Sequence, residues 1–318
     1  MKSQFQENQR YKLENLIENS IIFNGVKGNG FFMGKPRKFV LENGLYNVFE
    51  PIRKDVIDYF TKNNISWWGG GTPSGHILSS QIACINFLFL LRKDKQAVLS
   101  LIKSFSDDFI DVLEIPENDE STNGYIQFEA VSKTDHLNEK STTRGSNCTS
   151  IDALMYALHK DGKSKWIIPI EWKYTEHYNN QNKALEGENN CKGDERLYRY
   201  TDLINQSRQL KNENHQCYYF EPFYQLMRQT LWAEKMIEYR EKEFIDADDF
   251  LHIHIIPKEN DALLKKIYPC SKKNMEDTWR QHLNDQVKYR IISPEDFIKN
   301  IDKKKYKELL AYLATRYF

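Results

Sequence analysis

The sequence lacks several features that would place it in common functional classes. It has no run of about 18 consecutive apolar residues, and its first residues lack the apolar stretch of a signal peptide, so we expect a cytoplasmic protein that is neither secreted nor membrane-inserted. Its 5 cysteines form no C-x-x-C pair and no zinc spacing. Because their number is also odd, a closed disulfide framework is not expected, and we predict reduced thiols.

Net charge is absent as well, because 45 basic residues balance 45 acidic residues. A chain of this kind can bind a polyanion only if its basic side chains gather on one side. The C-terminal part is one candidate for such a surface, and an ordinary solvated helical surface is the alternative there. The glycine-rich residues 67–73 lack the Gly-Lys-Ser/Thr ending of a phosphate-binding loop, so we assign them an architectural role.

Two apolar segments flank an Asp-Gly turn signal formed by Asp161 and Gly162. Both central residues of a type I′ turn need a positive φ, which Asp and Gly tolerate, so the signal predicts a two-residue hairpin loop. A loop centred between these residues places Asp152 directly opposite Glu171. Opposed Cβ atoms lie roughly 4.5 to 5.5 Å apart, so the two carboxylates are expected to share one face of the hairpin.

Two close carboxylates repel each other unless a proton or a cation compensates their charge. A divalent ion is the natural compensation, so Asp152 and Glu171 are predicted to hold Mg²⁺, with Mn²⁺ as an alternative. Strand alternation returns Lys173 to the same face. Its ammonium would position the attacking water and offset charge on phosphate oxygens, and the pattern therefore predicts a metal-dependent phosphodiesterase site.

Asp152 followed by Glu171-Trp172-Lys173 resembles the D…(D/E)-x-K signature of the PD-(D/E)XK nuclease superfamily, the fold of many restriction endonucleases. Longer pieces resemble a group of bacterial restriction-endonuclease-like proteins, and this resemblance spans roughly residues 67–256; the pieces are residues 79–88, 144–150, 170–176 and 221–229. Ile151 stands where the name of the motif has a proline, which affects no ligand. The resemblance implies a mixed α/β fold, with a mixed central β-sheet flanked by helices.

We expect three parts along the chain, either as one elaborated domain or as closely packed units. Residues 1–104 are predicted to be mainly helical and to pack on the core. Residues 105–260 are predicted to form the PD-(D/E)XK nuclease core, and residues 261–318 a C-terminal helical extension.

Within the core, the hydrophobic patterns predict four strands and one long helix. The strands are expected at residues 125–131, 147–158, 166–174 and 250–256, and the helix at residues 219–240. Pro169 falls inside the second hairpin strand, where it cannot donate a ladder hydrogen bond. It therefore predicts a bulge or an unpaired position next to the site.

Further residues complete the predicted site, each with a structural alternative. Glu129 is a candidate third metal ligand, and a solvated or salt-bridged acid is the alternative. Related nucleases place a Gln or Lys on the helix after the Glu-x-Lys strand, so the resemblance implies that Gln225 or Gln229 steadies the water or the phosphate; simple surface exposure is the alternative. His252 and His254 share a strand face without a third ligand nearby, so packing explains them better than zinc binding.

Nucleic-acid contacts are expected from basic and aromatic side chains, namely Arg144, Tyr198, Arg199, Arg208 and Arg228. The leading hypothesis is a Mg²⁺-dependent endodeoxyribonuclease of restriction or defence type that acts on double-stranded DNA, as a monomer or a homodimer. The alternatives are a catalytically inactive nucleic-acid-binding protein of the same fold and a nuclease acting on RNA or on branched or damaged DNA. The acid pair favours the enzyme, because a binding module has no reason to keep two carboxylates facing a polyanion.

Overall fold

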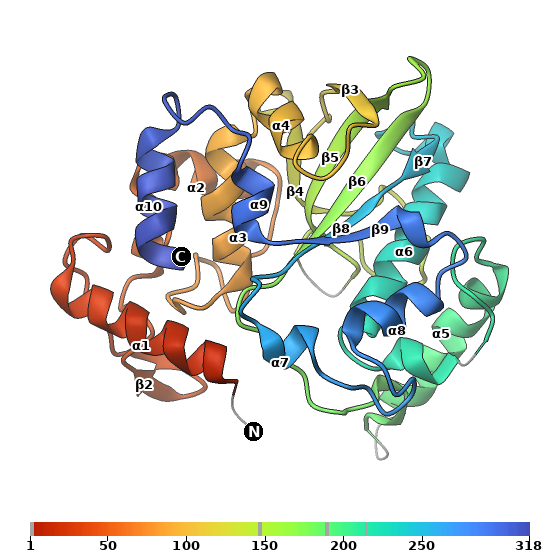
Figure 1. Ribbon diagram of the computed structural model, residues 1–318, viewed down its shortest axis with the longest axis horizontal. Helices are drawn as coiled ribbons and strands as arrows, with labels where there is room; N and C mark the ends of the chain where they lie inside the picture. Colours follow the sequence, from red (N-terminus) through yellow and green to blue (C-terminus); the bar gives the residue numbers. More distant parts are fainter. Residues whose placement is uncertain (1–2, 146–147, 188–190, 214) are drawn as a thin grey trace.

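The computed structural model describes residues 3–145, 148–187, 191–213 and 215–318. A seven-stranded mixed sheet runs through the molecule, and helices cover both of its faces (Figure 1). This architecture confirms the mixed α/β fold expected from the sequence. Asn147, the first residue of the expected strand 147–158, lies outside the described residues.

The sheet is built on a central antiparallel hairpin. Two strands pair antiparallel with the first hairpin strand, two pair parallel with the second, and a last strand extends the parallel side. In chain order the seven strands are β3 (Phe109–Val112), β4 (Ile126–Ala130), β5 (Ile151–His159), β6 (Lys165–Trp172), β7 (Asp249–Phe250), β8 (His252–Ile255) and β9 (Tyr289–Ile292). A separate two-stranded hairpin near the N-terminus consists of β1 (Gly30–Phe32) and β2 (Lys35–Arg37).

Helices from both ends of the chain cover one face of the sheet and share one hydrophobic core with it (Figure 1). They are α1 (Gln4–Asn19), α2 (Arg53–Lys62), α3 (Ser80–Leu88), α4 (Lys95–Ile102), α9 (Pro294–Ile298) and α10 (Lys307–Tyr317). A second core lies on the opposite face, under α5 (Lys192–Gln206), α6 (Phe223–Glu238), α7 (Asp261–Leu264) and α8 (Met275–Gln281). Within the described residues, no helix combines the length and the apolar character needed to cross a bilayer.

A stripe of buried side chains along one side of α6 explains why this segment forms a helix against the sheet. Phe223, Leu226, Met227, Thr230 and Leu231 recur at helical spacing, and all five are buried. Burial of one large apolar side chain stabilises the fold by about 1.5 to 3 kcal/mol, so this stripe holds α6 firmly on the sheet. The helix thereby presents its N-terminal half to the ends of β5 and β6.

The register of the β5–β6 hairpin agrees with the expectation. Ala153 faces Ile170, and Leu158 faces Lys165. The next step of the same register beyond Ala153 places Asp152 opposite residue 171. Because opposed residues of an antiparallel pair point to the same face, the hairpin brings the two acids together as the sequence predicted.

The turn of this hairpin is wider than expected. The His159 amide donates a hydrogen bond of 2.8 Å to the Ser164 carbonyl, so four residues separate the last bonded pair. The Asp161 carboxylate accepts a 2.8 Å hydrogen bond from the Ser164 amide. Gly162 has a φ of 72°, whereas Asp161 does not adopt a positive φ, so the predicted type I′ turn is wrong. The register survives because the wider loop is centred on the same point in the chain.

Pro169 leaves β6 regular and interrupts its neighbour. It lies opposite Leu154 in a continuous β5–β6 register, so the expected bulge is absent from β6. On the other edge of β6, the Leu251 amide donates to the Ile167 carbonyl at 3.1 Å. The next bond of a parallel ladder would run from the amide of residue 169 to the Leu251 carbonyl, and proline has no N–H. The parallel partner is accordingly split at Leu251 into β7 and β8.

Two observations correct the expectations. Residues 261–318 are not only helical, because they contribute β9 to the sheet. Cys217 and Cys270 form a disulfide with their Cα atoms 5.5 Å apart, so the expectation of reduced thiols is wrong for this pair. The two cysteines are separated by 53 residues, and no local spacing signals their approach. The division of the chain into three parts stays a prediction.

Candidate active site

The predicted acids lie in a row across three adjacent strands. Glu129 belongs to β4, Asp152 to β5 and Glu171 to β6. The β4–β5 register continues through positions 129 and 152, and the β5–β6 register reaches positions 152 and 171 one step beyond its last regular pair. The row ends on the parallel side at His254, which pairs with Glu171.

Lys173 and Glu171 form an ion pair inside the protein. Their Nζ and Oε1 atoms are 2.5 Å apart, and the two side chains are only 5% and 4% exposed. Burial opposes the charge on Lys173, but the carboxylate of Glu171 outweighs it and holds the pKa of Lys173 well above its ordinary value. The lysine therefore carries a permanent positive charge next to the acid row.

Helix α6 supplies both glutamines that the sequence singled out. Gln229 donates through Nε2 to the Oε2 atom of Glu171, and Gln225 accepts a 2.6 Å hydrogen bond from the Nζ atom of Lys173. These contacts place both glutamines at the site and not on the outer surface of α6. Glu171 near the end of β6 and Lys173 directly after the strand are thus each oriented by one side-chain amide from the helix.

Asp152 and Glu129 carry strongly perturbed carboxyl groups. Asp152 accepts a 2.7 Å hydrogen bond from the Trp172 amide through Oδ2, and Glu129 accepts one of 2.7 Å from Gln81 through Oε1. Burial, followed by the charges of Glu171 and Glu129, raises the pKa of Asp152 well above its usual range. Burial also raises the pKa of Glu129 to about 7. A proton or a cation is needed to stabilise this row.

A cavity of about 200 Å³ opens beside the acids. It is lined by Glu129, Gly145, Cys148, Thr149, Ser150, Asp152, Gln225, Arg228 and Gln229. The Oε1 atom of Gln229 is buried and has no hydrogen-bond partner among the described residues. Such an acceptor costs about 1 to 3 kcal/mol unless a bound molecule satisfies it, so the cavity is suited to take up a polar ligand.

The donor chemistry of the site fits a hard divalent cation, since Mg²⁺ and Mn²⁺ prefer carboxylate oxygens. The oxygens open to an ion are Oδ1 of Asp152 and Oε2 of Glu129, which have no hydrogen-bond partner among the described residues. Both oxygens of Glu171 are taken by Lys173 and Gln229. Within the described residues, no three acidic, histidine or cysteine side chains already converge on one point in a way that would hold an ion.

Arg228 stands at the wall of this cavity, where a nucleic-acid contact was expected. Its Nε atom donates to Oε1 of Glu139 at 2.9 Å and to the Thr149 hydroxyl at 3.0 Å. Burial opposes its charge, but the surrounding tyrosines and Glu139 raise the pKa of the guanidinium above its ordinary value. Arg228 therefore offers a fixed positive charge to a ligand in the cavity.

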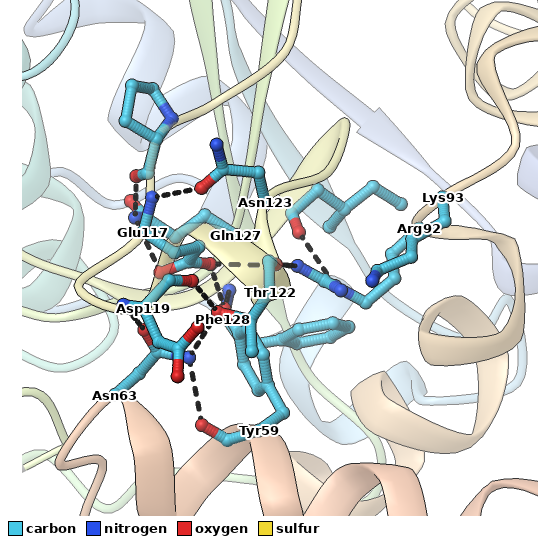
Figure 2. Close-up of polar contacts among 12 residues, drawn as sticks. Tyr59, Asn63, Arg92, Lys93, Glu117, Asp119, Thr122, Asn123, Gln127 and Phe128 are labelled. Atoms are coloured by element: carbon cyan, nitrogen blue, oxygen red, sulfur yellow. Dashed lines mark hydrogen bonds and ion pairs between the residues drawn. The ribbon is translucent and has the colours of Figure 1, made fainter.

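Arg144 was also expected to contact nucleic acid, but it belongs to a buried polar cluster that supports the site. Its Nη1 atom lies 2.7 Å from Oε2 of Glu117, and its Nη2 atom donates to the Tyr59 hydroxyl at 2.9 Å. Figure 2 shows Tyr59 and Glu117 of this cluster together with Arg92. The Nε atom of Arg144 donates to the backbone carbonyl of Glu129 at 3.3 Å. The guanidinium thus holds β4 where Glu129 adopts a φ of 49°, and we leave it out of the proposed nucleic-acid contacts.

The other expected contacts lie away from the acid row. Tyr198 and Arg199 belong to α5; Tyr198 is 90% exposed, and the Arg199 guanidinium lies 5.7 Å from the centroid of the Tyr200 ring. Arg208 is exposed and lines a separate cavity of about 840 Å³ at the C-terminal half of α6. None of the three expected contacts borders the cavity beside the acids.

His252 and His254 are buried, as the packing interpretation of these residues requires. Burial lowers the pKa of His252 to about 4 and that of His254 well below its ordinary value, so both rings are neutral. The Nδ1 atom of His254 is 2.8 Å from the Tyr289 hydroxyl. The two neutral histidine rings therefore pack in the interior, on the strand that lies beside Glu171.

Sequence reasoning missed Gln81 of α3. This glutamine connects strand β4 with the segment before α3, because it donates to Glu129 and accepts a 3.1 Å hydrogen bond from the Trp68 amide. The only available signal was its position in the segment 79–88 that resembles restriction-endonuclease-like proteins. Its partner could not be named from the sequence, since 48 residues separate it from Glu129.

Comparison with known families assigns the chain to one family. A family model described as "Restriction Endonuclease associating with ARP" matches residues 11–318, which is nearly the whole chain. No curated protein and no solved structure matches the chain significantly.

Proposed function

We propose that this chain, which belongs to the family of restriction endonucleases described as associating with ARP, is a metal-dependent endonuclease. It would hydrolyse phosphodiester bonds in double-stranded DNA. One observation carries the proposal. The acids Glu129, Asp152 and Glu171 stand in a row beside a cavity, with the ion-paired Lys173 next to them. Carboxylates beside a buried ammonium are suited to phosphodiester hydrolysis and would only hinder a module that merely binds a polyanion.

Asp152 and Glu129 would hold the metal through their open oxygens, and Glu171 would join them as a ligand when one of its oxygens is released by Lys173 or Gln229. A divalent ion bound there would supply Lewis acidity at the scissile phosphate. Lys173 would donate to the attacking water and offset the charge that develops on the phosphate oxygens. Gln225 holds the ammonium of Lys173 in place through its 2.6 Å hydrogen bond.

The remaining residues would orient the substrate and the acids. Gln229 fixes one oxygen of Glu171, and its unpaired Oε1 atom would accept a hydrogen bond from the water. Arg228 would donate to a non-bridging phosphate oxygen, because its guanidinium lines the cavity and carries donors beyond those engaged by Glu139.

Cleavage assays test the proposal directly. Supercoiled, linear and single-stranded DNA and a structured RNA would be incubated with Mg²⁺, Mn²⁺ or EDTA. We expect cleavage of double-stranded DNA with metal, none with EDTA, and none by Asp152→Ala. The matched control is Asp55→Ala, which removes an exposed acid of α2 and should cleave normally. Cleavage of RNA alone would replace the substrate, and a folded protein that cleaves none of these substrates with either metal would refute the proposal.

A further inference from the structure

The β1–β2 hairpin and the residue after it, hereafter the 30–38 hairpin, present large apolar side chains to solvent. Phe31 is 77% exposed and Met33 is 81% exposed. The hairpin turns at Gly34, which has a φ of 73°, and it lies below α1 at the lower left of the molecule (Figure 1). These two exposed side chains lie near the turn of one hairpin, so they form a local apolar patch and are not scattered surface residues.

The same segment concentrates positive charge in a chain that has none overall. Between Glu18 and Glu42 the sequence holds four basic residues and no acidic one; the basic residues are Lys27, Lys35, Arg37 and Lys38. None of these four side chains has an ion pair or a hydrogen bond within the described residues. Unpaired cations that flank an apolar tip are complementary to a polyanion with apolar bases.

A short series of contacts connects this hairpin to the acid row. The Phe32 ring lies 6.2 Å from the Trp68 ring, measured between centroids. The Trp68 amide donates to Gln81, and Gln81 donates to Glu129 at 2.7 Å. Trp68 is itself 52% exposed, so an accessible aromatic side chain lies between the hairpin and Gln81 in this series of contacts.

We propose that the 30–38 hairpin is a DNA-binding arm. Lys35 and Lys38 contact backbone phosphates of the duplex that flanks the scissile bond, and Phe31 and Met33 lie against bases in the adjacent minor groove. Proteins that enter this groove combine cations with apolar wedges in the same way. The inference rests on the proposed function, because it takes the duplex held at the acid row as the ligand of the arm.

Binding measurements separate the roles of charge and apolar tip. A short labelled duplex would be titrated by fluorescence anisotropy in a series of salt concentrations, with Ca²⁺ in place of Mg²⁺ to limit cleavage. Removing two phosphate contacts in K35A/K38A should weaken binding about tenfold or more and lower the slope of log K against log salt by about 2. Phe31→Ser should weaken binding without changing that slope, since it removes no charge.

The matched control is K303A/K304A, which removes the same charge from two exposed lysines within residues 261–318; for this part of the chain the proposal takes the alternative of an ordinary solvated surface. It should leave affinity and slope unchanged. An equal loss in K303A/K304A and K35A/K38A would overturn the arm and leave a non-specific charge effect. Circular dichroism of each variant checks that the fold is kept, as expected for substitutions at exposed positions.

The two proposals fail in different ways. If the unmodified protein cleaves DNA while the hairpin variants bind and cleave as it does, the arm is wrong and the nuclease stands. If the unmodified protein neither binds nor cleaves DNA, both are wrong.

Discussion

The ammonium of Lys173 lies 2.5 Å from the carboxylate of Glu171, and both side chains are almost fully removed from solvent. A buried pair of this kind is costly to break, because the remaining charge stays in the interior without compensation. Loss of either partner of this proposed catalytic pair is therefore expected to destabilise the fold as well.

Lys173→Ala is expected to lose activity by a factor of about 100 or more, since it removes an electrostatic contact to the transition state. It should also lower the free energy of unfolding by about 3 to 5 kcal/mol in the absence of metal, because Glu171 is left buried and unpaired. Urea denaturation with and without Mn²⁺ measures this loss, and the metal should restore part of it. Lys54→Ala, at an exposed position of α2, is the control. Near-normal turnover of the Lys173 variant would remove the lysine from the mechanism.

Asp152→Asn should separate metal binding from folding. The partly buried carboxylate of Asp152 repels Glu171 and Glu129, so its neutralisation should raise the stability of the metal-free protein. The unmodified protein should gain about 2.7 kcal/mol at a metal concentration about 100 times Kd, and the variant should gain much less. Thermal unfolding and calorimetric titration with Mn²⁺ provide both numbers. Unchanged metal affinity in the variant would show that the ions bind elsewhere.

The raised pKa of Glu129 should make the stability of the metal-free protein depend on pH. Its pKa rises on folding from an ordinary 4.5 to about 7, so the folded state holds a proton that the unfolded state releases between these values. The raised pKa stabilises the fold at low pH, and the free energy of unfolding should fall as pH increases from about 4.5 to about 7. Urea denaturation across this range should show a shallower decline in Glu129→Gln. An identical pH profile in that variant would contradict the assignment.

Arg144 should behave as a structural residue and not as a DNA contact. Arg144→Met leaves the buried Glu117 without its nearest cation, with Arg92 at 3.8 Å as the more distant one, and should lower the free energy of unfolding by about 3 to 5 kcal/mol. The double variant E117Q/R144M should recover part of this loss, which a double-mutant cycle measures. DNA affinity of the folded double variant should equal that of the unmodified protein, whereas Arg228→Ala should bind DNA more weakly. A specific loss of DNA affinity in E117Q/R144M would return Arg144 to the interface.

The sequence by itself determined the features that depend on local periodicity. Strand alternation and the centre of the Asp161-Gly162 turn were enough to place Asp152 opposite Glu171 and Lys173 on the same face. The turn type was wrong and the register was right, because a loop of another length with the same centre pairs the same residues. The apolar stripe of α6 likewise identified the helix and placed Gln225 and Gln229 together on it.

Only the tertiary structure decided which distant segments complete the site. Gln81 reaches Glu129 of β4 from α3, Arg144 turns inward to Glu117, and the fold brings Cys217 and Cys270 together. Such pairings are invisible in a single sequence, because they depend on how whole elements pack and not on the spacing of residues within one element. The partners in these contacts are 48, 27 and 53 residues apart in the chain, so only the folded molecule reveals them.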